Sequence, residues 1–163
     1  MNKSSNKNDV AEIQGFLADN LRYQGKYPEA MEARMAALSY YEQQNDSAKI
    51  VEAWMGIGVI HLMMEKYGEA EQQFKHANRW YESQNDSTGL GFAETALSLA
   101  YYRFDSLDAA ISHGFRSFQI REALGDIRGK GESLNNLALI YMAKGAWSQA
   151  KDYLEASLNF LEK

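Results

Sequence analysis

Apolar residues recur along this chain at the spacing of amphipathic helices, and the same two-helix pattern appears four times. Residues 133–160, SLNNLALIYMAKGAWSQAKDYLEASLNF, contain two such helices joined by a short turn at residues 144–146. Four alanines, spaced at intervals of 40 residues, share one position near the start of the second helix: Ala30, Ala70, Ala110 and Ala150. A fixed period of this length predicts a stack of repeats, because each unit buries its apolar face against its neighbours.

The junctions between the units repeat at the same interval. They read Asn45–Asp46–Ser47, Asn85–Asp86–Ser87 and Gly125–Asp126–Ile127. Each aspartate can accept hydrogen bonds from the free N–H groups of the following helix, so each junction is a helix stop followed by a helix start. We expect an all-α fold of eight helices without a linker between domains. The predicted parts are a disordered leader at residues 1–8 and one domain at 9–163, with repeats at about 9–44, 46–84, 86–124 and 126–163.

Two of the units carry a recognisable set of residues. The second unit has Trp54, Gly58, Tyr67, Ala70, Phe74 and Ala77, and the fourth has Leu137, Ala138, Tyr141, Gly145, Ala150 and Leu154. This set resembles the tetratricopeptide repeat (TPR), although the usual closing proline is missing. The period of 40 exceeds the usual period of about 34 and is similar to the long repeats of kinesin light chain and of bacterial signalling and peptide-receptor domains. The resemblance implies a right-handed α-solenoid of four helix-turn-helix repeats.

In this family the first helix of each unit lines a concave groove that holds a peptide or helix from a protein partner. Helical spacing then selects the residues of the first helices that point into the groove. They are Phe16, Asp19 and Tyr23 (with Glu12); Glu52, Met55, Val59 and Met63; Phe92, Thr95, Leu99, Tyr102 and Arg103; and Glu132, Asn135, Asn136 and Leu139. The predicted groove is mostly apolar, with acidic residues near its start and amides near its end.

Asn135 and Asn136 are the strongest single candidates for partner binding. An amide side chain has both a donor and an acceptor, so it can pair with a peptide backbone of any sequence. The alternative is that one amide caps or bridges neighbouring helices while the other is solvated. A second family function is disfavoured: the Lys–Asn–Asn–Lys–Arg set with which some co-chaperones hold a carboxylate is replaced by Gly15, Asp19, Gly56, Phe92 and Ala96.

Composition and motifs argue against most other functions. The net charge of −5 disfavours nucleic-acid binding, and no apolar run is long enough to span a membrane. Without cysteine, and with His61, His76 and His113 scattered, the sequence predicts no cofactor and no metal site. The paired glycines do not complete a phosphate-binding motif. A cytoplasmic location is the expectation.

The sequence thus predicts a non-catalytic protein–protein interaction scaffold, which could form the TPR part of a larger bacterial regulatory protein. One alternative is a self-assembling module that oligomerises through its last repeat, where Leu154, Leu158 and Leu161 form an apolar face. A remote alternative is an enzyme using Asp19 and Glu52.

Overall fold

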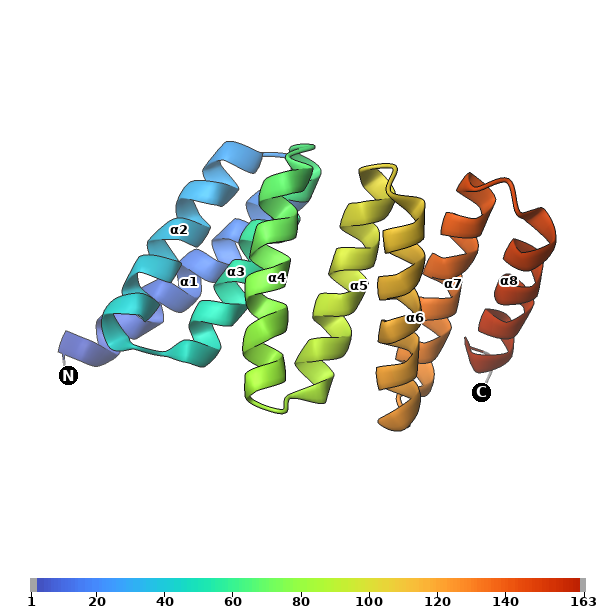
Figure 1. Ribbon diagram of the computed structural model, residues 1–163. Coiled ribbons are helices and arrows are strands. Elements are labelled where there is room, and N and C mark those ends of the chain that lie inside the picture. Colours follow the sequence, from blue (N-terminus) through green and yellow to red (C-terminus); the bar gives the residue numbers. More distant parts are fainter. Residues whose placement is uncertain (1–2, 162–163) are drawn as a thin grey trace. The chain divides into compact units, whose positions relative to one another are not determined.

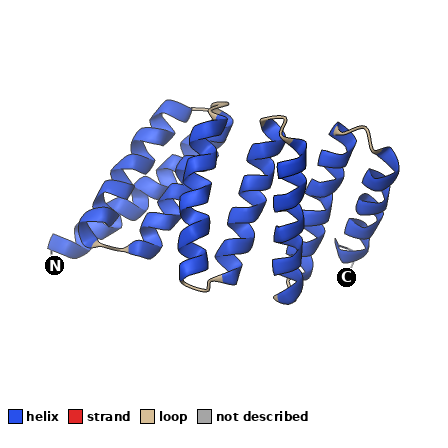
Figure 2. Ribbon diagram, in the orientation of Figure 1, coloured by secondary structure: helices blue, strands red, loops and turns tan. Residues whose placement is uncertain are grey.

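The computed structural model describes residues 3–161, and it describes side chains for residues 9–160. Within residues 3–161 the chain forms eight helices and no strand, as the sequence predicts (Figures 1 and 2). The helices are α1 (Lys3–Tyr23), α2 (Tyr27–Gln44), α3 (Ser47–Met63), α4 (Tyr67–Ser83), α5 (Ser87–Arg103), α6 (Leu107–Ala123), α7 (Ile127–Ala143) and α8 (Trp147–Leu161).

The three junctions between repeats begin their helices in the same way. The side chain of Asp46 accepts a hydrogen bond from the backbone N–H of Lys49 at 3.1 Å. Asp86 and Asp126 each accept one from the N–H of the glycine three residues later, at 2.9 and 2.8 Å. The predicted aspartate caps are confirmed, and each one stabilises its helix by about 1 kcal/mol.

Each turn inside a hairpin depends on one residue in the left-handed region. Gly25, Glu65, Asp105 and Gly145 have φ values of 74°, 60°, 59° and 76°. This conformation lets the next N–H reach back five residues; for example, the N–H of Lys66 donates to the carbonyl of His61 at 2.9 Å. The bond satisfies a carbonyl that the helix end would otherwise leave without a partner. Glycine takes this conformation without cost, whereas glutamate does not.

The chain divides by its contacts into two compact units, Met1–Ala77 and Asn78–Lys163, with the boundary inside α4. In the first unit α2 packs against both α1 and α3. Leu38 of α2 lies against Ala53 and Ile57 of α3, and all three are buried. The side chain of Phe74 is fully buried and fills the space beside Gly58, where an added Cβ would lie 2.5 Å from the Phe74 ring.

In the second unit α5 packs on α6, α6 on α7 and α7 on α8, so these helices run side by side in alternating directions (Figure 1). The same hydrogen bond closes both hairpins. The hydroxyl of Ser117 donates to the carbonyl of Gly91 at 3.1 Å, and that of Ser157 donates to the carbonyl of Gly131 at 2.8 Å. Small side chains at these crossings let the backbones approach closely. The prediction that all four repeats form one domain stays a prediction.

The start of the first helix differs from the prediction. We expected a disordered leader at residues 1–8 and a cap at Asp9, but α1 begins at Lys3 and Asp9 lies within it. Residues 3–8 contain no glycine or proline, and extending an existing helix over such residues costs little. The predicted leader is therefore wrong for residues 3–8, while residues 1–2 lie outside the described part of the chain.

We predict that Glu65→Gly stabilises the protein by about 1 kcal/mol, because glycine relieves the left-handed strain at this turn. Denaturant unfolding monitored by circular dichroism measures the change. The matched control is Glu42→Gly at an exposed position inside α2, which should cost up to about 1 kcal/mol. A loss of stability in both variants would contradict the strain at Glu65.

A second pair of substitutions tests the close crossing at Gly58. Gly58→Ala should destabilise the protein by about 1–3 kcal/mol, because the new methyl group would overlap the buried Phe74 ring. Gly68→Ala, in the first turn of α4, meets no atom within 4 Å and should be neutral or stabilising by up to about 1 kcal/mol. Thermal unfolding of the two variants side by side measures both effects.

Candidate protein-binding groove

In each unit two successive first helices lie next to each other, since α1 contacts α3 and α5 contacts α7. The predicted groove residues lie on these four helices, and none of them is buried. Within each unit the helices therefore form a face on which the predicted residues are accessible. We describe the two faces separately as the first-unit groove and the second-unit groove.

The first-unit groove contains two adjoining hollows between α1 and α3. One, of about 210 Å³, is lined by Glu12, Gly15, Phe16, Asp19, Arg34, Tyr41, Lys49, Glu52 and Ala53. The other, of about 320 Å³, is lined by Asp19, Arg22, Arg34, Glu52, Met55, Gly56 and Val59. The predicted residues Phe16, Asp19, Glu52, Met55 and Val59 thus line this groove.

Arg34 lies at the floor of both hollows, although it belongs to the second helix of its hairpin. Its Nη2 donates to Oδ1 of Asp19 at 2.7 Å, and its side chain is only 12% exposed. Its Nε is buried and has no hydrogen-bond partner among the described residues. Gly56 makes this position possible, because a Cβ there would lie 2.6 Å from Nε. The sequence analysis did not select Arg34. Its only signal in the sequence is that a charged residue stands at the position where the next repeat has the buried Phe74, 40 residues later.

The remaining charges of the first-unit groove are more exposed. The ammonium group of Lys49 donates to Glu52 at 3.0 Å, and this hydrogen bond raises the pKa of Lys49. Both side chains are more than a third exposed, so the pair contributes little to stability. Its charged groups therefore remain available to a ligand.

The second-unit groove holds a small, mainly apolar hollow between α5 and α7. It is lined by Ser98, Leu99, Tyr102, Asn136, Leu139 and Ile140. Leu99 is 40% and Leu139 43% exposed. Asn136 is half-buried and Asn135 is exposed, and neither amide has a hydrogen-bond partner within the part of the chain that the structure describes. The alternative reading, in which one amide bridges neighbouring helices, therefore finds no such bond there.

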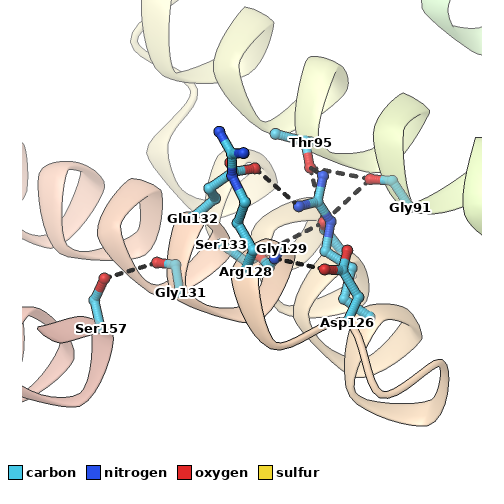
Figure 3. Close-up of polar contacts among 11 residues, drawn as sticks. Gly91, Thr95, Asp126, Arg128, Gly129, Gly131, Glu132, Ser133 and Ser157 are labelled. Carbon is cyan, nitrogen blue, oxygen red and sulfur yellow. Dashed lines mark hydrogen bonds and ion pairs between the residues drawn. The ribbon is translucent and has the colours of Figure 1, made fainter. Parts of the chain in front are cut away.

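One end of the second-unit groove is organised around Arg121 of α6, a second residue that sequence analysis missed. Its side chain is 5% exposed, and Nη1 donates to Glu132 at 3.1 Å. Nη2 donates to the Thr95 hydroxyl at 3.3 Å, and the guanidinium lies 5.1 Å from the centre of the Phe92 ring. Thr95 of α5 and Glu132 of α7, both labelled in Figure 3, thus bind this group from two different helices. The predicted groove residues Thr95 and Glu132 thus position Arg121. Beside them is a hollow of about 290 Å³, lined by Thr88, Phe92, Arg121, Leu124 and Asp126.

Asn135 lines none of these hollows, and Tyr23, Met63 and Arg103 also lie outside them. Tyr23 is 80% and Met63 36% exposed, and Arg103 is also exposed. Tyr23 stacks on the guanidinium of Arg22 at 4.2 Å. These side chains could contact a partner only at the edge of the groove.

A buried carboxylate lies behind the second-unit groove. Glu94 is completely buried and accepts hydrogen bonds from Asn78 at 2.7 Å and His113 at 2.6 Å, and its other charged neighbour is Arg116 at 3.1 Å. Burial alone would raise the pKa of Glu94. The two hydrogen bonds and the positive charge outweigh burial and hold that pKa below its ordinary value of 4.5. The cluster is enclosed by helices, and we interpret it as a structural ion pair.

No group of three or more metal-ligating side chains occurs among the described residues. None of the helices over residues 3–161 is both long and apolar enough to cross a bilayer. The accessible chemistry of the described faces thus consists of exposed apolar side chains, amides and paired charges. This is the surface chemistry of a helical-repeat binding protein.

Comparisons with known proteins agree with this class. Two models of the tetratricopeptide repeat match residues 9–83 and 131–163. The chain belongs to the tetratricopeptide repeat family, as the sequence resemblance predicts, and the typical role of this fold is protein–protein interaction. No curated protein matches the sequence.

Three solved structures share the fold at low identity. BtubC (BKLC) from P. vanneervenii has a TM-score of 0.82 and 19% identity, and the match covers 93% of this chain and 63% of BtubC. Aspartyl phosphate phosphatase F from Bacillus subtilis has a TM-score of 0.87 and 14% identity, with coverages of 95% and 41%. The apo form of RapI has a TM-score of 0.81 and 13% identity, with coverages of 98% and 44%. The chain therefore spans about two fifths to three fifths of the length of these proteins.

We predict that Glu94→Gln lowers the free energy of unfolding by about 1–3 kcal/mol at neutral pH, because it removes the charge that Arg116 and His113 face. The folded-state pKa of Glu94 is lowered, so the ionised carboxylate contributes its full stabilisation above pH 4.5 and loses it as the pH falls through the folded-state value. The difference in the free energy of unfolding between wild type and Glu94→Gln should therefore shrink over that acidic range.

Urea unfolding at a series of pH values measures this dependence. Glu42→Gln, at an exposed position of α2, is the control and should follow the wild type throughout. A constant difference between wild type and Glu94→Gln at all pH values would contradict the lowered pKa.

Proposed function

We propose that this chain binds an extended peptide or a helix of another protein along its first helices, with the second-unit groove as the main contact. The observation that carries the proposal is the pair Asn135 and Asn136, which lack hydrogen-bond partners among the described residues. Asn136 lines the hollow with Leu99, Tyr102 and Leu139, and Asn135 is its exposed neighbour on α7. A polar group that is accessible, unpaired and next to exposed apolar side chains is what a peptide-binding surface requires.

The two kinds of side chain have separate tasks in this proposal. The amides pair with the ligand backbone, because each has a donor and an acceptor in fixed relation. The hollow is shallow, at about 10 Å³, so an apolar side chain of the ligand lies over it and covers the exposed area of Leu99 and Leu139. Affinity therefore comes mainly from apolar burial, and orientation comes from the amides.

The first-unit groove would accept polar ligand groups. The exposed carboxylates of Asp19 and Glu52 are 46% and 59% accessible, while the cations Arg34 and Lys49 neutralise them in part. A ligand group there competes with existing pairs, so this groove adds selectivity more than affinity.

The role is that of a non-catalytic scaffold within a larger bacterial regulatory protein, in the cytoplasm. The support is that the similar solved structures are longer than this chain, and that one of them is an aspartyl phosphate phosphatase of a bacterium. The partner is a protein or peptide, and the proposal includes no cofactor, nucleic acid or membrane insertion.

The test uses random peptides displayed on phage and selected on the immobilised 163-residue chain, followed by calorimetric titration of a selected synthetic peptide. Asn135→Ala combined with Asn136→Ala should weaken binding by about tenfold or more, corresponding to the loss of about 1.4 kcal/mol of polar contacts. Leu99→Glu should weaken it at least as much, because a charge would occupy the apolar hollow.

Asn159→Ala, an exposed amide on α8, is the matched control and should leave the affinity unchanged. Peptides that bind wild type, the double alanine variant and Leu99→Glu equally well would contradict the proposed groove. Circular dichroism of each variant confirms that the helices are retained.

A further inference from the structure

Helices α1 and α8 expose apolar stripes at positions whose counterparts in the other repeats are buried or half-buried. On α1 the stripe consists of Val10, Ile13 and Leu17, which are 50%, 61% and 43% exposed. On α8 it includes Trp147 and Leu158, which are 66% and 56% exposed. Exposed apolar surface of this kind is unusual unless another molecule covers it.

The 40-residue register shows what covers the corresponding positions of α1 elsewhere. The counterparts of Ile13 are Ala53, Ala93 and Ser133, which are 1%, 0% and 2% exposed. The counterparts of Leu17 are Ile57, Leu97 and Leu137, which are 3%, 1% and 0% exposed. In these repeats the face is therefore buried in the core, and only in α1 is it open.

The counterparts of Leu158 all contact the first helix of the following repeat. Leu38 of α2 lies against Ala53 and Ile57 of α3. Asn78 of α4 donates to Glu94 of α5 at 2.7 Å. Phe118 of α6 lies 5.5 Å from the ammonium group of Lys130 of α7. Each of the three counterparts thus contacts the next first helix, and Leu38 does so on the counterparts of Ile13 and Leu17.

The exposed stripes of α8 and α1 thus correspond to the two sides of the α2–α3 contact, which the chain already makes internally. Leu158 is the counterpart of the residue that covers, and Ile13 and Leu17 are the counterparts of the residues that are covered. In the α2–α3 contact the covering residue is also a leucine, Leu38, which is only 7% exposed. A leucine packed over two aliphatic side chains buries apolar area without leaving a polar group unpaired.

We propose that copies of this chain associate end to end, with α8 of one copy lying on α1 of the next. The occupant of each stripe is a second copy of this chain, and the contact is heterologous because two different faces meet. Ile13 is larger than Ala53, Ala93 and Ser133, so the two helices stand further apart than α2 and α3 do. The stripes use a different face of α1 from the groove, and association leaves the groove accessible.

The test measures the solution mass of the 163-residue chain by light scattering over a wide range of concentrations. The wild type should grow from monomer to larger species as the concentration rises. Ile13→Glu and Leu158→Glu should each raise the dissociation constant by about tenfold or more, because a charge would be buried in the contact. Both residues are exposed, so neither substitution should disturb the fold.

Mixing the two variants distinguishes a heterologous contact from a symmetric one. Ile13→Glu retains an intact α8 stripe and Leu158→Glu an intact α1 stripe, so a 1:1 mixture should form a dimer that cannot grow further. Met35→Glu is the control, because Met35 is 50% exposed on α2 and belongs to neither stripe. Two of its three counterparts, Lys75 and Glu155, are charged, while the third, Phe115, contacts Tyr153 of α8, and self-association should not change.

A wild-type monomer at every concentration would overturn the proposal and assign the stripes to further repeats or to a different protein. A mixture that stays monomeric, while the wild type associates, would also overturn it, since that result indicates a symmetric contact. Peptide binding to the second-unit groove should be the same in all these variants, so failure of end-to-end association leaves the proposed function intact.

Discussion

No repeat of this protein can bury its own first helix, and most features of the structure follow from that constraint. A first helix has its hairpin partner on one side only, and its other side is covered by the second helix of the preceding repeat. Leu38 on Ala53 and Ile57 is the simplest example. Where two backbones must approach closely, the side chains are small, as at Gly58 beside Phe74 and at the two serines that donate to Gly91 and Gly131. The stability of the protein is therefore spread over all its repeats, because each repeat depends on contacts with its neighbours.

This constraint also explains where the chain places its buried charges. Arg34, Glu94 and Arg121 all lie at contacts between neighbouring helices. Another repeat has a buried apolar or aromatic side chain at each of these positions, namely Phe74, Leu134 and Tyr41. Glu94 is fully paired by Asn78, His113 and Arg116, and Arg121 by Glu132 and Thr95. Arg34 is paired only on one side, because its Nε faces a helix backbone at Gly56. Such pairs add little net stability compared with an apolar core, but they penalise a wrong helix register strongly.

The repeat architecture could be predicted from the sequence because it depends on period and capping, which are local. The alanines at a 40-residue interval and the three Asp caps place most helix starts within a residue or two. The start of α1 could not be predicted, since residues 3–8 have neither an apolar stripe nor a breaker, and the helix simply extends through them. For the groove, spacing identified the accessible face of the first helices. It could not show that Arg34 and Arg121 reach that face from second helices, because their long side chains cross between neighbouring helices, and helical spacing describes only the helix to which a residue belongs.

A binding protein built in this way has two kinds of surface with different specificity. The groove joins side chains of different first helices, such as Leu99 of α5 and Asn136 of α7, and a ligand there is recognised by the combination. The stripes of α1 and α8 instead continue the internal packing of the stack, and what they recognise is another helix of the same kind. Because the two surfaces use different faces, occupying one leaves the side chains of the other in place. Binding at the groove and extension of the stack are therefore energetically separable, and any coupling between them has to pass through the shared helices.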